Sequence, residues 1–427
     1  IRDAQESRGL GDVYKRQEQN TTHAAPTGRT LSHTPSKIAH KRAAIATGLY
    51  PILSIFNHFV PIFLREMGLS ATLITFVLTW DNYLNMLMQP IVGQLSDNTR
   101  TALGRRKPWV LAGAPLAGVA FLMVPASPVV WGMMLAIFLT NLGAALMRSP
   151  GVALIGDLYP SRQRSIANGI INLMLGVGAG LAYFGGGWLY GQFGRYAPFL
   201  FGSAMLFLAI VVVLFFIREP ANPVDQPDEP EAGFRETLHT LLSQHDSSLF
   251  WMLGAILSWF MGFTALEALL SLIGKEALDI PPDKMGQFVA LLLAVFVLCA
   301  VPSGILATRF GRRRIILLGL TGLIATLLYG YTVQSVPMLI GFLVLAGFFW
   351  AFVNVNSLPA LYDTAPYLRA GIITGLYYLA SNLSAVLGPQ LAGVLVDLTD
   401  NNYRMVFLYG AFFMTLAWAC MRRVRVA

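Results

Sequence analysis

Long apolar runs constrain this chain more than any other feature of its sequence. Stretches of about 20 mainly apolar residues, the length needed to cross roughly 30 Å of hydrocarbon, recur from residue 40 onward. The mean hydropathy is +0.59, and 55% of the residues are hydrophobic. The alternating segments typical of membrane β-barrels are absent from the sequence. The sequence therefore predicts an all-α membrane protein that crosses the bilayer many times.

Twelve transmembrane helices are predicted from these runs. They cover residues 42–65, 70–96, 108–126, 129–158, 165–190, 196–217, 248–273, 284–308, 313–333, 337–361, 369–396 and 403–421. A Pro- and acid-rich stretch, residues 218–247, separates the first six helices from the last six. We therefore expect an N-terminal six-helix bundle at 42–217, a linker at 218–247, and a C-terminal six-helix bundle at 248–421.

The segments outside the bundles are polar. Residues 18–41 are expected to be disordered, and residues 422–427 to form a short tail. The string "DVYKRQ" at 12–17 matches the translation of a transposon adapter used in library preparation. Residues 1–17 are therefore expected to be a sequencing artefact and are left out of the fold prediction.

Basic residues are distributed unevenly between the predicted loops. The loops after even-numbered helices, with the segments that flank the first and last helices, hold nineteen Lys and Arg, whereas the other loops hold five. The positive-inside rule then places both termini on the cytoplasmic side of the inner membrane. This placement accounts for the net charge of +8 without a nucleic-acid partner. Cys299 and Cys420 lie singly in apolar runs, so no metal or redox site is expected.

Two loop sequences recur at equivalent places in the two halves. "GQLSDNTRTALGRRKP" (93–108) follows the second helix, and "GILATRFGRRRI" (304–315) follows the eighth. "LYPSRQRSIANG" (158–169) and "LYDTAPYLRAGIITG" (361–375) follow the fourth and tenth helices. A Gly-Arg-Arg turn could serve topology alone, but a matched pair six helices apart favours two pseudo-symmetric halves.

These loops resemble a hallmark motif of the major facilitator superfamily, so the chain is expected to have that fold. The resemblance implies a cytoplasmic gate motif in which Asp97 joins the two halves. The residues that the resemblance places in this motif are Gly93, Asp97, Gly104, Arg105, Arg106, Arg309, Gly311, Arg312 and Arg313.

Two stretches resemble one branch of that superfamily. "QPIVGQLSDNTRTALGRRKPW" (89–109) and "ALIGDLYPSRQRSIANG" (153–169) are similar to sucrose/proton symporters and to the related melibiose-type glycoside/cation symporters. Val152 stands where the sucrose branch has Arg, and Arg148 lies one turn earlier. Asn85 and Gln89 stand where the melibiose type has sodium-binding acids. The resemblance therefore implies sugar symport, with H⁺ favoured over Na⁺ as the coupling ion.

Four titratable residues interrupt the predicted spans: His58, Asp81, Arg148 and Glu267. A charge at the centre of a bilayer costs about 2.5–3.5 kcal/mol on insertion scales. Such residues persist where they are paired, hydrated or functional. Asp81, Glu267 and His58 are the candidates for proton coupling, with Asp81 favoured because it lies near the middle of its helix. Alternatively, Asp81 and Arg148 form a structural ion pair, and Glu267 serves as a gate or faces water.

Polar and aromatic residues share helix faces at the spacings i, i+4 and i+7. Amides and charged groups can bond sugar hydroxyls, and aromatic rings can stack on the apolar face of a pyranose. The substrate-binding candidates are Asn85, Gln89, Asn141, Arg148, Trp259, Trp350, Asn354, Tyr378 and Asn382. Each amide could instead bond a neighbouring helix, and each Trp could simply pack.

Taken together, these features predict a monomeric secondary transporter that carries a glycoside or oligosaccharide with protons by alternating access. No catalytic motif or cofactor-binding motif is present in the sequence. Drug or metabolite efflux by the same fold is the alternative within transport. A non-transporting membrane sensor or scaffold is the alternative from another class, and it would need no opposing charges inside the membrane.

Overall fold

The structure is a computed structural model that describes residues 52–158, 161–216, 247–365 and 370–424. The predicted segments at 1–17 and 18–41 lie outside the described residues, as do nearly all of the linker and the end of the tail. The described helices begin with one over residues 52–66. The others are α3 (Ala71–Leu78), α4 (Trp80–Asn98), α5 (Lys107–Ala126), α6 (Val130–Leu158), α7 (Ser161–Phe193), α8 (Ala197–Phe216), α10 (Ser247–Leu272), the π-helix η1 (Ile273–Ala277), α11 (Pro282–Phe310), α12 (Arg312–Tyr331), α13 (Val336–Thr364), α14 (Ala370–Leu398) and α15 (Met405–Arg423).

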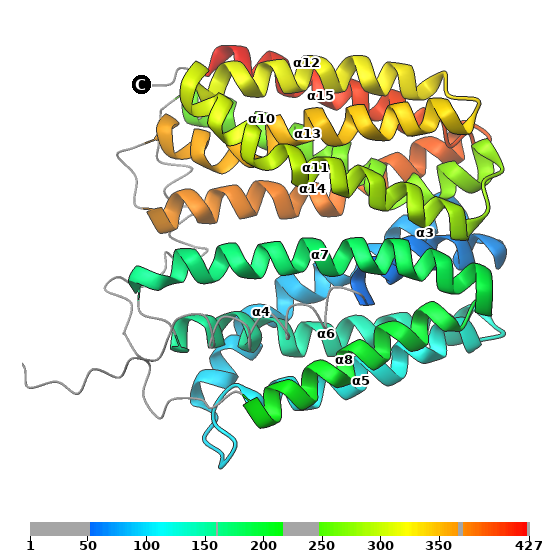
Figure 1. Ribbon diagram of the computed structural model, residues 1–427, viewed down its shortest axis with the longest axis vertical. Coiled ribbons are helices and arrows are strands. Elements are labelled where there is room, and N and C mark those ends of the chain that lie inside the picture. The colour runs from blue at the N-terminus through cyan, green and yellow to red at the C-terminus, as the bar shows by residue number, and fades with distance from the viewer. Residues whose placement is uncertain (1–51, 159–160, 217–246, 366–369, 425–427) are drawn as a thin grey trace, which may run out of the picture. The chain divides into compact units, whose positions relative to one another are not determined.

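The helices form two groups that follow the order of the chain (Figure 1). In the first group α6 packs against α4 and α5, and α8 packs against α5 and α7. In the second group α10 packs against α14 and α15, and α13 packs against α11 and α12. The groups meet where α7 packs against α11 and where α3 packs against α14. This arrangement leaves the faces of α4, α7, α10 and α11 next to the boundary between the groups.

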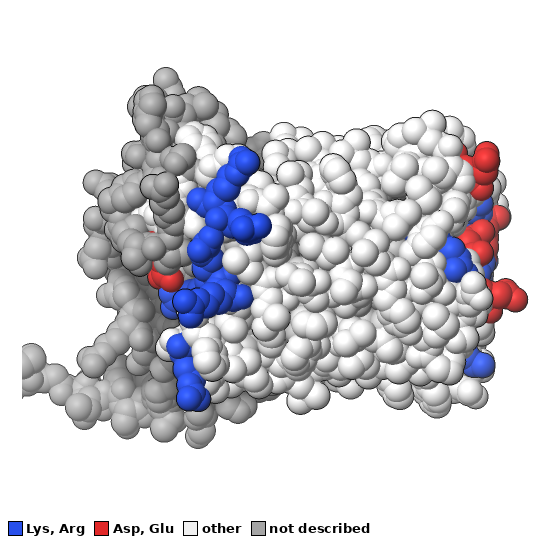
Figure 2. All heavy atoms as spheres, turned by 90° about the horizontal axis from the view of Figure 1, so that it is seen from above, with Lys and Arg blue, Asp and Glu red and all other residues white. Residues whose placement is uncertain are grey.

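The helices run back and forth between two ends of the bundle. We call the end with the 99–106 loop and Gly311 the loop end, and the end with residues 67–70, 278–281 and 399–402 the far end. Lys and Arg side chains gather at the loop end, whereas the far end carries both signs of charge (Figure 2). The surface between the two ends is formed by uncharged residues on the face shown. A band of this kind matches the apolar interior of a bilayer.

Nine helices in the described part of the chain are long and apolar enough to cross a membrane. The predicted spans at 42–65, 70–96 and 165–190 are not among them. The first is described only from residue 52, and the side chains of 161–175 in α7 are not described. The second is divided at Thr79 into α3 and α4, which the sequence did not indicate.

Thr79 separates α3 from α4 with a backbone at φ −84° and ψ 0°. Its hydroxyl donates to the carbonyl of Phe76 at 3.0 Å and accepts from Gln390 Nε2 of α14 at 3.1 Å. A threonine hydroxyl bonded back to the preceding turn competes with regular helix geometry. The break puts Asp81 in the first turn of α4.

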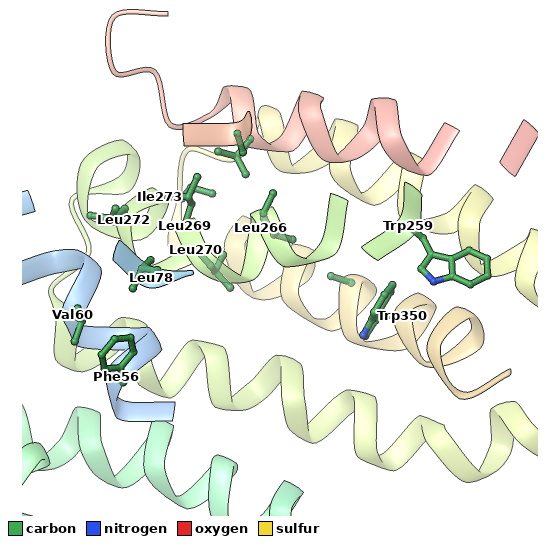
Figure 3. Packing of buried hydrophobic residues seen from close by; sticks show 14 of the residues in the cluster. Phe56, Val60, Leu78, Trp259, Leu266, Leu269, Leu270, Leu272, Ile273 and Trp350 are labelled. Atoms are coloured by element: carbon green, nitrogen blue, oxygen red, sulfur yellow. The ribbon is translucent and has the colours of Figure 1, made fainter. Parts of the chain in front are cut away.

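A large buried apolar cluster fills the interior of both groups, and Figure 3 shows part of it. It includes Phe56 and Phe121 from the first group and Trp259 and Phe342 from the second. Where the groups meet, glycines allow the helices to approach closely. A Cβ on Gly393 of α14 would lie 2.8 Å from the Ala71 carbonyl oxygen of α3, and a Cβ on Gly286 of α11 would lie 2.8 Å from the Tyr183 carbonyl oxygen of α7. Any larger residue at these two positions would push the groups apart.

Candidate functional site

A cavity of about 320 Å³ lies between the two groups of helices. The helix at 52–66, α4, α6 and α7 line it from the first group, and α10 and α11 line it from the second. Leucine and valine side chains form much of its wall, and polar side chains project from both groups. A cavity shared by two helix groups suits a small molecule that must contact both.

Three charged side chains line this cavity: Asp81 of α4, Arg148 of α6 and Glu267 of α10. The charge of Arg148 acts on Asp81, and the charge of Asp81 acts on Glu267. Glu267 is an exposed residue, and the surface that it faces is the cavity. Its helix packs against α14 and α15. The sequence predicted all three as charges that need a partner or water, and the structure brings them together.

A second cavity of about 190 Å³ shares Asn57, Asp81 and Glu267 with the first. Its other walls come from the α3–α4 junction, including Thr79, and from α14. The two carboxyl groups are therefore reachable from two spaces. A proton carrier that must exchange with water from different directions needs such access.

His58 lies in the wall of the larger cavity and is 2% exposed. Its Nε2 is 2.8 Å from the carbonyl oxygen of Pro282, at the start of α11. A carbonyl can only accept, so Nε2 carries the hydrogen. The Nδ1 atom has no hydrogen-bond partner in the described part of the protein. His58 thus joins the two groups through one nitrogen and leaves the other available.

The other predicted substrate residues are distributed around this site. Trp350 stacks on Phe263 of the cavity wall, with ring centroids 3.8 Å apart, so it forms a second layer behind the wall. Trp259 is fully buried in the apolar cluster. Neither of these two lines either described cavity. Their part in substrate binding stays a prediction.

The six predicted polar residues outside the two cavity walls differ in burial. Asn85 and Asn141 are buried, and within the described residues Asn85 Oδ1 and Asn141 Nδ2 have no partner. Asn354 is half-buried, and those that are exposed are Gln89, Tyr378 and Asn382. The structure places none of these in the walls of the two cavities, and their role also stays a prediction.

Sequence reasoning missed several polar residues of the cavity. Ser54 and Asn57 line it from the helix at 52–66, Tyr183 from α7 and Ser271 from α10. Ser54, Asn57 and His58 are spaced i, i+3 and i+4, which puts them on one helix face. That spacing was available in the sequence and could have extended the predicted site to the first helix.

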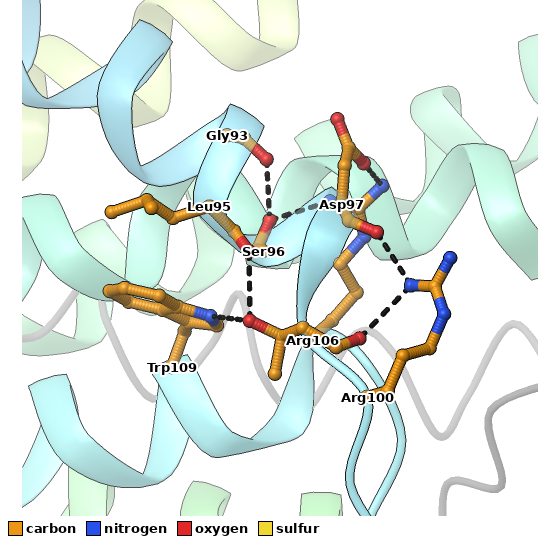
Figure 4. A network of polar contacts seen from close by, with 8 residues as sticks. Gly93, Leu95, Ser96, Asp97, Arg100, Arg106 and Trp109 are labelled. Carbon is orange, nitrogen blue, oxygen red and sulfur yellow. Dashed lines mark hydrogen bonds and ion pairs between the residues drawn. The ribbon is translucent and has the colours of Figure 1, made fainter.

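The gate motif at the loop end folds within the first group (Figure 4). Arg106 Nη2 pairs with Asp97 Oδ1 at 2.5 Å, and its Nη1 donates to Ser96 Oγ at 2.6 Å. Arg100 Nη1 donates to the carbonyl of Asp97 at 2.6 Å. Gly104 turns the loop with φ +110°, a conformation that favours glycine. Arg106 is buried by these contacts, whereas Asp97 is exposed.

The matching motif of the second group makes contacts within its own group. Arg312 of α12 pairs with Asp363 of α13. Arg313 Nη2 donates to the Arg422 carbonyl at 2.6 Å. Gly311 turns between α11 and α12 with φ +92°, and the Arg309 guanidinium lies 5.5 Å from the Phe310 ring centroid. The described contacts of both motifs thus hold helices of the same group together.

At the far end, by contrast, side chains connect the two groups. Asp397 of α14 accepts from the backbone N–H groups of Ala71 and Thr72, both at 2.9 Å, and from the Thr72 hydroxyl at 2.6 Å. Lys275 Nζ donates to Glu66 Oε1 at 2.7 Å. Polar contacts therefore cross the boundary between the two groups at the far end.

Comparison with known proteins gives a consistent family. The sequence profile of the Major Facilitator Superfamily matches residues 44–298 and 275–426. "Multidrug resistance protein 2" of Bacillus subtilis is 24% identical over 370 residues, which cover 84% of this chain and 89% of that protein. "Proton-associated sugar transporter A" of Homo sapiens is 28% identical over 193 residues, which cover 40% of this chain and 26% of that protein.

The solved structures agree with the fold. A bacterial homolog of the human lysosomal transporter Spinster, in an inward-facing and unoccupied conformation, superposes with a TM-score of 0.74 at 16% identity, covering 91% of this chain and 97% of that one. The predicted all-α membrane fold is thereby confirmed, and the chain is a multi-pass membrane protein. With the profile matching almost all of the sequence from residue 44 onward, this chain belongs to the Major Facilitator Superfamily.

Proposed function

We propose that this transporter carries a neutral glycoside or oligosaccharide together with protons. The observation that carries the proposal is the pair of carboxyl groups, Asp81 and Glu267, which line one cavity between the two helix groups beside Arg148. Carboxyl groups can bind and release protons, and Arg148 offers five fixed N–H donors. No cofactor is part of the proposal, and H⁺ is the coupling ion.

Alternating access supplies the mechanism of the proposal. At the far end, Asp397 and the Lys275–Glu66 pair connect the two groups. These contacts support a conformation that is closed at the far end, and the inward-facing state of the solved Spinster homolog is consistent with it. If the basic loop end lies on the cytoplasmic side of the inner membrane, the cavity would open toward the cytoplasm. The transporter acts as a monomer in this proposal.

Proton binding to Asp81 would change the charge of the cavity by one unit. With Arg148 nearby, an ionised Asp81 favours an arrangement that keeps the two charges close, and a protonated Asp81 frees the guanidinium to bond a sugar hydroxyl. Sugar and proton would then be required together before the groups rearrange. That requirement is the basis of symport.

Drug efflux is the second candidate, and one comparison favours it. The similarity to "Multidrug resistance protein 2" extends over 84% of this chain, whereas the similarity to "Proton-associated sugar transporter A" extends over 40%. The polar cavity lining supports the sugar reading, because hydroxyl-rich ligands need donors and acceptors from the wall. Apolar drugs would leave those groups unpaired.

Uptake into proteoliposomes tests the proposal. Sucrose, maltose and melibiose, each radiolabelled, would be presented with an inward proton gradient, with an inward sodium gradient, and with neither. We expect at least one of these sugars to accumulate when protons drive uptake and not when sodium does. If none of the three sugars is transported and a lipophilic cation such as ethidium is transported when protons drive it, the result would favour efflux.

Arg148→Lys is expected to reduce proton-driven sugar uptake at least tenfold. Lysine keeps the positive charge but loses the planar set of five donors that can bond two acceptors at once. The initial rate of uptake, normalised to the amount of reconstituted protein, measures the effect. Uptake at the wild-type rate by the lysine variant would leave Arg148 with an electrostatic role only.

Asp97→Asn is expected to reduce uptake about tenfold while sugar affinity stays within threefold of wild type. The carboxylate pairs with Arg106 at the loop end and is remote from the described cavity walls, so it affects the conformational step and not binding. Equilibrium binding and initial uptake rates, measured on the same preparation, separate the two effects. Asp363→Asn, which removes the acid that pairs with Arg312 in the second group, is the comparison.

A further inference from the structure

Two residues that line the larger cavity, His58 and Ser271, each carry a buried polar atom that has no hydrogen-bond partner in the described part of the chain: His58 Nδ1 and Ser271 Oγ. His58 is 2% exposed, and Ser271 is 3% exposed. Proteins rarely leave buried donors and acceptors unpaired, and an exception inside a cavity calls for a ligand or a water molecule. Both residues lie on the far-end side of the cavity, because Pro282 contacts His58 and η1 begins two residues after Ser271.

The chemistry of His58 restricts what can bind beside it. Nε2 donates to the Pro282 carbonyl, so in the neutral imidazole Nδ1 can only accept. The Phe59 and Tyr183 rings each pack nearly perpendicular to the imidazole, with ring centroids 4.5 and 6.1 Å from its own. A ligand at Nδ1 must therefore bring an O–H or N–H donor. A carboxylate or phosphate oxygen cannot satisfy it.

Ser271 complements this requirement. Its hydroxyl can donate and accept, and it lies four residues after Glu267 on α10, which places both on the same helix face. The neighbouring cavity residue on the first helix is Asn57, whose amide offers two donors and one acceptor site. The far-end side of the cavity thus offers an uncharged mixture of donors and acceptors. Sugar hydroxyls match such a mixture, because each hydroxyl also donates and accepts.

We propose that His58 Nδ1 and Ser271 Oγ form a hydroxyl-recognition subsite at the far-end side of the cavity. The subsite binds one hydroxyl of a neutral polyhydroxylated ligand, which donates to His58 Nδ1 and accepts from Ser271 Oγ. This inference rests on the proposed transport of a neutral glycoside. It adds which residues of the protein recognise one of the ligand's hydroxyl groups. It also assigns His58 to recognition, where the sequence suggested proton coupling.

The two nitrogens of His58 can be separated by substitution. The glutamine amide nitrogen can replace Nε2, so His58→Gln keeps a donor for Pro282 and loses the cavity acceptor. The asparagine amide oxygen can replace Nδ1, so His58→Asn keeps the acceptor and loses the donor. Ser271→Ala removes the hydroxyl, and Ser258→Ala is its matched control. Ser258 is buried on the same helix, and its hydroxyl donates to the Gly254 carbonyl at 2.7 Å.

Calorimetric titration of purified protein in nanodiscs with sucrose, maltose and melibiose measures the effect. We expect His58→Gln and Ser271→Ala each to weaken binding of the recognised sugar about tenfold, His58→Asn to weaken it less than His58→Gln does, and Ser258→Ala to stay within threefold of wild type. Affinities within twofold of wild type for both His58→Gln and Ser271→Ala would overturn the subsite. Equal loss in His58→Gln and His58→Asn would also overturn it, because that result indicates a contact with Pro282 only.

Ligand analogues test the subsite without changing the protein. In a monodeoxyfluoro sugar, fluorine replaces one hydroxyl and cannot donate. One such analogue should bind the wild type about tenfold more weakly than the parent sugar, and His58→Gln should bind the analogue and the parent equally. The same tenfold discrimination in His58→Gln would overturn the subsite while leaving sugar transport intact. If the wild type binds none of the three sugars, the proposed function fails, and the subsite fails with it.

Discussion

Asp81→Asn is expected to abolish the accumulation of sugar against its gradient while exchange and downhill flux of the same sugar continue. Asparagine has nearly the same shape as aspartate but cannot bind and release a proton near neutral pH. Asp81 is the carboxyl group that lies within the influence of Arg148 and lines both described cavities. Removing its titration should therefore uncouple sugar from protons without closing the path. Counterflow and gradient-driven uptake, compared in the same proteoliposomes, measure the two activities.

Glu267→Gln is the matched comparison, because Glu267 also lines both cavities. If Asp81→Asn still accumulates sugar under a proton gradient and Glu267→Gln does not, the carrier is Glu267. Accumulation that follows sodium and ignores pH would contradict the proton assignment altogether. Loss of counterflow in Asp81→Asn would show that Asp81 is needed for binding or for the conformational change, and not for coupling alone.

Asp397→Asn is expected to shift the transporter by tenfold or more toward an open far end. The carboxylate accepts three hydrogen bonds at the start of α3, two of them from backbone N–H groups that would otherwise be unpaired at a helix N-terminus. Hydrogen bonds to a charged group contribute about 1.5–3 kcal/mol each, and an asparagine side chain retains only part of that stabilisation. A change of about 1.4 kcal/mol is a tenfold shift between two states.

Pulsed electron paramagnetic resonance can measure this shift. The native cysteines would first be removed by Cys299→Ser and Cys420→Ser. Spin labels would then be attached to cysteines introduced at Ala126 and Gln334, which are exposed positions at the far end, one in each group. In Asp397→Asn, the distribution of distances between the two labels should gain population at longer distances. Asp400→Asn changes an exposed acid three residues away and should leave the distribution as in the otherwise native protein. Identical distributions for Asp397→Asn and Asp400→Asn would show that Asp397 does not hold the far end closed.

The sequence predicted the charged part of the site because each charge was anomalous where it stood. Asp81, Arg148 and Glu267 each interrupt an apolar run, and the cost of a charge in lipid implies a shared cavity. Serine and asparagine are ordinary in membrane helices, so Asn57 and Ser271 gave no comparable signal. The i, i+3, i+4 spacing of Ser54, Asn57 and His58 was a weaker signal, and the packing of the helix at 52–66 near α10 and α11 is what identifies Asn57 and Ser271 as cavity residues.

The features at the boundary between the groups were beyond sequence reasoning. Asp397 and Ala71 are separated by 326 residues along the chain, and nothing in either local sequence indicates their contact. The break at Thr79 lacks the glycine or proline that usually marks an interrupted helix. It depends instead on the Thr79 hydroxyl and on Gln390 of the second group. Order along the chain predicted the two bundles, whereas three-dimensional packing decides which surfaces bind across them.

Because of the break at Thr79, the helix that follows α3 along the chain is not the one that packs most closely against it. By order along the chain α3 belongs to the first group, yet it is bound to α14 by Asp397 and by the close approach at Gly393. A single residue, Thr79, separates this short helix from α4, and backbone hydrogen bonds continue across it. We therefore expect α3 to keep its contacts with both α4 and α14 when the two groups rearrange. The moving parts of the protein need not coincide with its two sequence repeats.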